Sequence, residues 1–161
     1  GMIFFVVFLK WDYSLMAGAA TAAIMVLPTI LSTTKEALDA VPDSYREGSF
    51  ALGTGKLRTI FKVVLPAAVP GILSGIILAI GRIVGETAAL LYTSGTATRG
   101  LTKGLMSSGR TLAVHMYTIS SEGFHTKQTF ATAVILLIFV FIINTLSSVA
   151  AKQISKKAGG Q

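Results

Sequence analysis

The chain has 161 residues, of which 52% are hydrophobic and only 13% charged, and its mean hydropathy is +0.70. This composition is too apolar for an ordinary soluble domain and indicates a membrane protein. The lack of cysteine excludes a disulfide framework and a thiol nucleophile. The net charge of +7 comes from basic residues beside apolar runs, without interleaved aromatics, which argues against a nucleic-acid-binding protein.

The N-terminal part of the chain predicts one short helix and one membrane span. Residues 2–9 are apolar but too few to cross a bilayer, so they predict the end of a helix or an interfacial helix. No basic segment precedes them, and a cleaved signal peptide is therefore not expected. Residues 15–31 carry no charge and predict a first span, kinked at Pro28. The helix is expected to continue into water until Pro42 stops it.

Two short helices are expected within residues 43–66. Pro42 precedes a polar start, and Gly53 is a plausible break after the first helix. Thr54 is expected to cap the second helix, whose apolar residues recur at helical spacing while its basic residues lie elsewhere. This pattern predicts an amphipathic helix at a surface or a partner. The apolar positions are Leu57, Ile60, Phe61 and Val64.

Two further spans are expected at residues 67–92 and 130–151, separated by a polar outer loop at 93–128. The second span contains glycines four residues apart, which permit close helix packing. Lysine and arginine are more frequent in residues 32–66 and in the C-terminal tail than on the opposite side of the three spans. The positive-inside rule therefore predicts that residues 32–66 and the C-terminus face the cytoplasm.

Arg82 and Glu86 are the ionisable residues that the sequence places inside a span. They lie four residues apart, so we expect them on one helical face, with Arg82 just past mid-membrane. Such groups usually face a bundle interior or a hydrated cavity, where an arginine can hold an oxyanion and a glutamate can orient it. Two interpretations stay open: these residues line a transport path, or they form an ion pair that only fixes helix packing.

No catalytic or metal site is expected in this chain. His115 and His125 have no metal-ligand spacing and no accompanying carboxylate pair. The run from Gly53 to Lys56 is not a phosphate-binding Walker A loop, because position 50 is Phe and Leu57 stands where Ser or Thr is required. We therefore expect no ATPase activity from this chain.

Several motifs resemble those of a known transporter family. Glu47, then Gly53, nine residues and Val63-Val64-Leu65-Pro66 resemble the EAA loop of ABC-importer permeases. Further along, Gly81-Arg82-Ile83-Val84-Gly85-Glu86-Thr87-Ala88 is similar to a run in phosphate-importer permeases of the PstA type. Shorter matches are Leu27-Pro28-Thr29-Ile30, Val41-Pro42 and Ser121-Glu122-Gly123. The resemblance covers roughly residues 15–150.

This resemblance implies an all-α transmembrane bundle with the type I, MetI-like permease fold, of which this chain is the C-terminal part. It implies a permease for inorganic phosphate in a bacterial or archaeal cytoplasmic membrane. The alternatives are another oxyanion such as molybdate or sulfate, or a non-transporting scaffold. The implied partners are a separate ATPase that binds ATP and Mg²⁺, a second permease subunit, a phosphate-binding protein and membrane lipid. No cofactor is expected on this chain.

The same resemblance assigns ATPase coupling to part of residues 43–66. Gly48 and Ser49 replace the two alanines of the family loop, and Gly48 weakens a helix by up to about 1 kcal/mol relative to alanine. The residues expected to couple to the ATPase are Glu47, Gly48, Gly53, Leu57, Phe61, Leu65 and Pro66.

Overall fold

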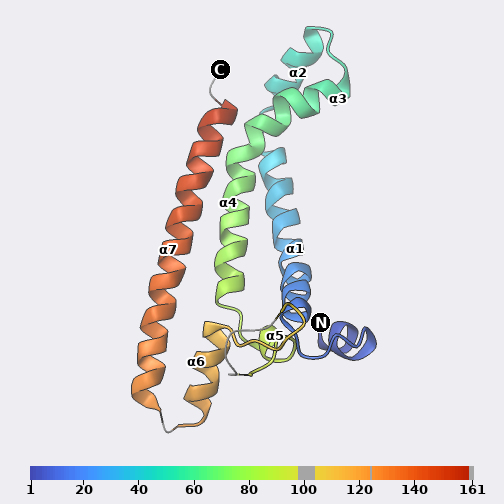
Figure 1. Cartoon of the computed structure of the whole chain (residues 1–161). Helices are drawn as coiled ribbons and strands as arrows, with labels where there is room; N and C mark the ends of the chain where they lie inside the picture. The colour runs from blue at the N-terminus through green and yellow to red at the C-terminus, as the bar shows by residue number, and fades with distance from the viewer. Residues whose placement is uncertain (98–103, 124, 160–161) are drawn as a thin grey trace. The chain divides into compact units, whose positions relative to one another are not determined.

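The computed structural model describes residues 1–97, 104–123 and 125–159 (Figure 1). These residues form helices and no strand, which confirms the expected all-α fold. Two of the elements are π-helices, η1 and η2. In chain order the elements are η1 (Met2–Phe8), α1 (Leu15–Asp39), α2 (Asp43–Ala51), α3 (Lys56–Thr59), η2 (Ile60–Val64), α4 (Leu65–Val84), α5 (Ala88–Leu91), α6 (Leu112–Ser121) and α7 (Thr126–Gly159).

Three helical stretches are long and apolar enough to cross a membrane: Leu15–Asp39, Lys56–Val84 and Thr126–Lys156. The second stretch joins α3, η2 and α4 without interruption. These lengths and compositions are those of a multi-pass membrane protein. The apolar window of the third stretch has none of its residues buried, so α7 leaves these side chains open to the surroundings.

The chain divides into two compact units, which we describe separately. The first unit holds Gly1–Leu27 and Gly81–Ile142, and the second holds Pro28–Ile80 and Ile143–Gln161. In the second unit the end of α1, η2 and the start of α4 share a core of Val41, Val64 and Ala68.

Glycines bring α1 and α4 close together in the second unit. A Cβ added at Gly71 would lie 2.6 Å from the Cβ of Ala37, and one added at Gly75 would collide with the side chain of Thr33. The first glycine pair of α4 therefore serves close helix packing, as its spacing predicts. Gly85, which lies four residues after Gly81, meets no side chain of another helix and directly follows the end of α4.

In the first unit, the loop after α5 caps the start of α1. Ala22, Leu90 and Val114 form the core there. The side chain of Ser14 accepts a hydrogen bond from the Ala17 amide, and loop carbonyls accept the other free amides of the first turn. These donor and acceptor pairs are Ser14 to Thr93, Leu15 to Ser107 and Met16 to Leu105.

The helix ends differ from those expected. The expected span at 67–92 is wrong beyond Val84, because Gly85 breaks the helix and a separate helix α5 begins at Ala88. The helix expected at 130–151 starts at Thr126 and extends to Gly159. The expected outer loop at 93–128 contains an unpredicted helix, α6, which Thr111 caps by accepting from the Val114 amide. Arg99 and Lys103, which entered the charge comparison, lie outside the described residues.

Candidate functional site

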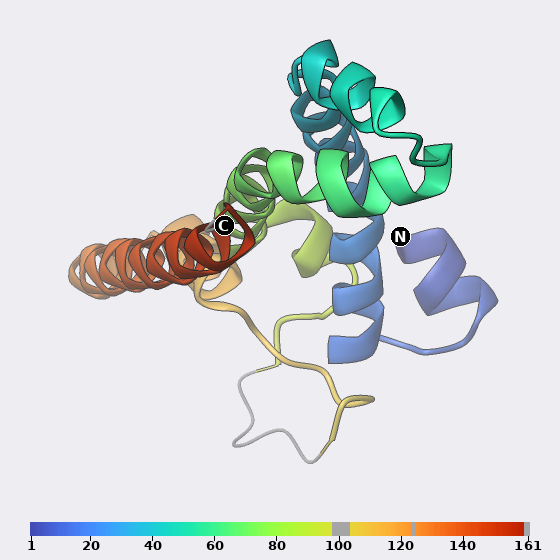
Figure 2. The same ribbon diagram turned by 90° about the horizontal axis from the view of Figure 1, so that it is seen from above.

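The segment between α2 and α3 is a tight turn at the end of the second unit, and Figures 1 and 2 both show the two helices side by side. Gly53 has a φ of +77°, a conformation that side chains with a Cβ disfavour. Its amide donates to the carbonyl of Phe50 at 2.8 Å, which closes α2. The predicted break at Gly53 and the short helix before it are therefore confirmed. The second helix is not a separate short helix, because α3 continues without interruption through η2 into α4.

Three hydroxyl groups hold α2 against α3. The Oγ of Ser49 lies 2.5 Å from the Oγ1 of Thr54 and 2.9 Å from the Oγ1 of Thr59, and the two threonine oxygens are 3.0 Å apart. Thr54 donates to the carbonyl of Ser49 at 2.6 Å, and Thr59 donates to that of Gly55 at 3.3 Å. The expected capping role of Thr54 is wrong, because α3 begins after Gly55 without a side-chain cap and the Thr54 hydroxyl turns back to α2.

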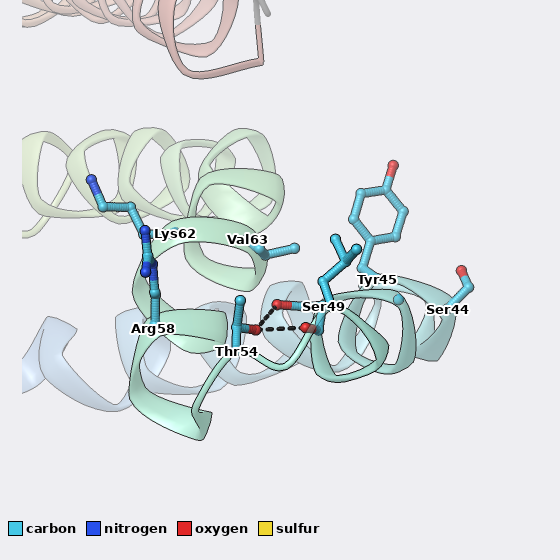
Figure 3. A pocket seen from close by; sticks show the side chains of 9 residues that line it. Ser44, Tyr45, Ser49, Thr54, Arg58, Lys62 and Val63 are labelled. Atoms are coloured by element: carbon cyan, nitrogen blue, oxygen red, sulfur yellow. Dashed lines mark hydrogen bonds between the residues drawn. The ribbon is translucent and has the colours of Figure 1, made fainter.

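Beside this hydroxyl cluster is an open groove of about 550 Å³ (Figure 3). Ser44 and Tyr45 of α2 form one wall, and Arg58 of α3 and Lys62 of η2 form the other. The two basic side chains make this wall positive, and no acidic side chain lines the groove. The groove can therefore receive a polar or acidic element of a partner.

Arg46 joins α2 to the end of α1, a role that the sequence analysis missed. Its Nη2 donates to the carbonyl of Leu38 at 3.0 Å, and its Nη1 donates to that of Val41 at 3.2 Å. Nη1 also pairs with Asp43 at 2.6 Å. The guanidinium thus binds one carbonyl of the last turn of α1 and one just beyond it, where a positive charge is also favoured by the helix dipole. The signal in the sequence was an arginine three residues after an N-terminal aspartate, just beyond a helix end.

The apolar side chains of α3 and η2 differ in exposure: some face solvent and one lies in the core. Leu57 is 72% exposed and Phe61 64% exposed, whereas Val64 is buried between α1 and α4. Leu52, at the tip of the α2–α3 turn, is 85% exposed. Exposed leucine and phenylalanine side chains are typical of a surface that contacts another protein or lipid. Leu57 and Phe61 lie at the start of the membrane-capable stretch Lys56–Val84.

The other expected coupling residues have distinct positions. Glu47 is exposed on α2 and Gly48 lines the groove, while Leu65 and Pro66 are half-buried at the start of α4. Pro66 has no amide to donate to the preceding turn, and η2 closes instead through the Leu65 amide and the Ile60 carbonyl. Such π-helical turns often mark functional sites. The structure thus gathers these residues on one segment but places only Gly48 in the groove.

Arg82 and Glu86 do not share a helical face, contrary to the expectation. Arg82 lies in the last turn of α4, and Glu86 lies in the break between α4 and α5. The amide of Glu86 donates to the carbonyl of Ile83, and its Oε1 accepts from the amide of Ala89 at 3.2 Å. Glu86 therefore caps α5, a role that the unbroken helix expected from the sequence could not reveal.

Arg82 is exposed, and no hydrogen bond or ion pair joins its side chain to the described residues. The ion pair with Glu86, one of the two open interpretations, is therefore not formed among the described residues. Arg110 in the same unit is different, because its guanidinium donates to the carbonyl of Thr96 at 2.7 and 3.0 Å and contacts Nδ1 of His115 at 3.0 Å. Arg82 thus keeps all its donors available for an anion.

Comparison with known proteins agrees with these features. The model of the family "Binding-protein-dependent transport system inner membrane component" matches residues 1–159. The Phosphate transport system permease protein PstA of Yersinia pestis is 40% identical over 139 residues, which are 85% of this chain and 47% of that protein. PstA 2 of Mycobacterium bovis is 35% identical over 144 residues, covering 89% of this chain and 48% of that protein.

A third relative is the Probable ABC transporter permease protein YqgI of Bacillus subtilis, which is 34% identical over 135 residues, 76% of this chain and 46% of that protein. The chain spans about half the length of these curated relatives. No solved structure matches it significantly. The matches confirm the resemblance to phosphate-importer permeases that the sequence motifs indicate and, with the three membrane-capable helices, the MetI-like permease fold. The chain belongs to the family of binding-protein-dependent transport system inner membrane components.

Proposed function

We propose that this chain is a membrane-spanning permease subunit of an ATP-driven ABC importer that moves inorganic phosphate across the cytoplasmic membrane of a bacterium or archaeon. The observation that carries this proposal is its identity of 35–40% with proteins named as phosphate permeases, over 84–89% of the chain. Transport of molybdate or sulfate is the alternative within the same family.

The proposed importer contains several chains with separate roles. A separate ATPase subunit binds and hydrolyses ATP with Mg²⁺, a second permease subunit completes the path, and a phosphate-binding protein delivers the anion on the outer side. This chain then contributes the coupling surface and part of the path, and it binds no cofactor of its own.

Coupling is proposed to act through the segment from α2 to η2. Leu57 and Phe61 dock on the ATPase, since burying two exposed apolar side chains favours association. The helical run is continuous from Lys56 to Val84, so a push on Leu57 is transmitted directly to α4. Arg46 carries the same displacement to α1 through the carbonyls of Leu38 and Val41.

Arg82 is proposed to bind the anion during its passage. It sits in the last turn of α4 with its donors free, and a planar guanidinium can bind two phosphate oxygens at once. Glu86 supports the site by capping α5 beside the break at Gly85. The scaffold alternative is disfavoured because it requires a structural pair between Arg82 and Glu86, which the described residues do not form.

The test is phosphate-stimulated ATP hydrolysis and radiolabelled phosphate uptake by the assembled importer that contains this chain. Arg82→Ala is expected to abolish uptake, and Arg82→Lys to reduce it at least about tenfold, since a point charge replaces a bidentate fork. The matched control is Lys127→Ala, which removes another exposed cation of the same unit and leaves uptake unchanged. Membrane levels of every variant are measured by immunoblotting.

Three outcomes would contradict parts of the proposal. Stimulation by molybdate or sulfate but not by phosphate would assign the importer to another oxyanion. Normal uptake by Arg82→Ala at a normal membrane level would remove Arg82 from the path. Loss of Arg82→Ala from the membrane would show that the arginine serves assembly instead.

A further inference from the structure

A second groove in the second unit lies between α4 and α7, outside the coupling segment. Its volume is about 340 Å³. On α7 it is lined by Ser148, Lys152, Ser155 and Lys156, which recur at helical spacing and so form one stripe. On α4 it is lined chiefly by apolar side chains, among them Leu73 and Ile77.

The positive charge of this groove is uncompensated. Neither α4 nor α7 contains an aspartate or glutamate, and no acidic side chain lines the groove. Lys152 and Lys156 are both exposed. Two ammonium groups one helical turn apart, without a carboxylate nearby, attract an anion.

The apolar side of the groove indicates which anion it takes. Leu73 and Ile77 belong to the apolar stretch of α4, and the two lysines directly follow the apolar stretch of α7. The site therefore combines hydrocarbon-facing side chains with a basic end where a membrane-spanning helix leaves the bilayer. Basic pockets between membrane helices at this level bind the head groups of anionic lipids.

We propose that the groove between α4 and α7 binds an anionic phospholipid, with Lys152 and Lys156 on the head-group phosphate and Leu73 and Ile77 along an acyl chain. Ser148 and Ser155 supply neutral donors for the remaining head-group oxygens. Free inorganic phosphate is also an anion but has no acyl chain, so it leaves the apolar wall uncovered. The site is independent of the proposed anion path, because neither Arg82 nor Glu86 lines the groove.

The experiment titrates the detergent-purified importer with phosphatidylglycerol and follows the tightest-bound lipid by native mass spectrometry. A lysine near the membrane surface contributes about 1 kcal/mol to anionic lipid binding, so Lys152→Gln with Lys156→Gln is expected to weaken binding roughly 30-fold. The matched control removes two lysines outside the groove, Lys35→Gln with Lys127→Gln, and is expected to change binding less than about twofold. Ser148→Phe keeps both lysines but fills the groove, and it is also expected to weaken binding.

Parallel titrations use zwitterionic phosphatidylcholine and inorganic phosphate, and neither is expected to bind in a lysine-dependent way. Equal losses in the groove and control double variants would overturn the proposal, because charge alone would then explain binding. Full binding by Ser148→Phe would place the lipid outside the groove. Binding of inorganic phosphate that depends on Lys152 and Lys156 would show a free-anion site instead of a lipid site. Phosphate uptake is not the readout, so failure here is distinct from failure of the transport proposal.

Discussion

At the scale of single residues, two glycines of the coupling segment have opposite roles. Both Gly48 and Gly53 have open space where a Cβ would be added. Gly53 has a positive φ, whereas Gly48 lies within α2. The cost of a side chain at each position is therefore set by backbone conformation and not by crowding.

Gly53→Ala is expected to destabilise the α2–α3 turn by about 1–2 kcal/mol, because alanine is strained in the left-handed region. Gly48→Ala is expected to stabilise α2 by up to about 1 kcal/mol, because glycine is a poor helix former. Titration of the ATPase subunit onto the purified permease measures the effect: binding weakens in the first variant and is unchanged or tighter in the second. Equal weakening of ATPase binding by both alanines would show that a side chain at either position blocks docking, whatever the conformation of the turn.

Arg46 makes a second prediction at this scale. Arg46→Gln removes the donors to Leu38 and Val41, so α2 is expected to lose its fixed orientation on α1, and ATP hydrolysis is expected to become independent of phosphate. Asp43→Asn is the control, because it weakens only the exposed ion pair, which is worth at most about 1 kcal/mol. The measurement is the ratio of ATP hydrolysis with and without phosphate. A normal ratio in Arg46→Gln would exclude this connection.

At the scale of helices, glycine and proline in the sequence predicted some helix ends, whereas others depended on contacts that form only in the folded chain. Gly53 follows the end of α2 with a positive φ, and Pro42 directly precedes the start of α2, as their backbone chemistry predicts. The end of α4 was missed because the chain becomes apolar again at Ala88–Leu91, so a single span was drawn through the break at Gly85. The carboxylate of Glu86 caps α5, and this bond depends on a break that periodicity cannot detect.

The hydroxyl cluster between α2 and α3 could not be predicted from the sequence either. Ser49, Thr54 and Thr59 are ordinary polar residues in the chain, and they become a cluster only because the turn at Gly53 folds the two helices together. Exposure of Leu57 and Phe61 was predictable from their spacing, but the burial of Val64 on the same stripe required the contact with α1.

Thr59→Val tests this cluster, since it keeps the shape of a side chain that is 1% exposed but removes its hydroxyl. The loss leaves Ser49 with one partner fewer and is expected to cost about 1–2 kcal/mol in docking α3 on α2. Hydrogen exchange of the α2 and α3 amides is expected to rise, with no change in α7. Thr129→Val is the matched control, because its hydroxyl donates to the carbonyl of His125, just before α7, and not to α2 or α3. Unchanged exchange in α2 and α3 would show that packing alone holds the two helices.

At the scale of the whole molecule, the chain offers two surfaces of different character. The segment from α2 to η2 presents exposed apolar side chains and a basic groove to a protein partner. The groove between α4 and α7 presents lysines beside an apolar wall to a lipid. In the importer we propose, the first surface receives the force of ATP hydrolysis, and the helical run from Lys56 to Val84 conveys it toward Arg82.

The most direct measurement compares ATPase copurification and phosphate uptake in two double variants. Leu57→Ser with Phe61→Ser removes the exposed apolar pair of the coupling segment, and Leu105→Ser with Met106→Ser removes an equally exposed apolar pair of the first unit. Loss of two docking side chains is expected to cost at least about 3 kcal/mol, or roughly a hundredfold in ATPase affinity. We expect the first variant to reach the membrane normally without ATPase or uptake, and the second to behave as wild type. Full copurification and uptake by the first variant, or equal losses in both, would contradict the assignment of residues 43–66 as the coupling surface.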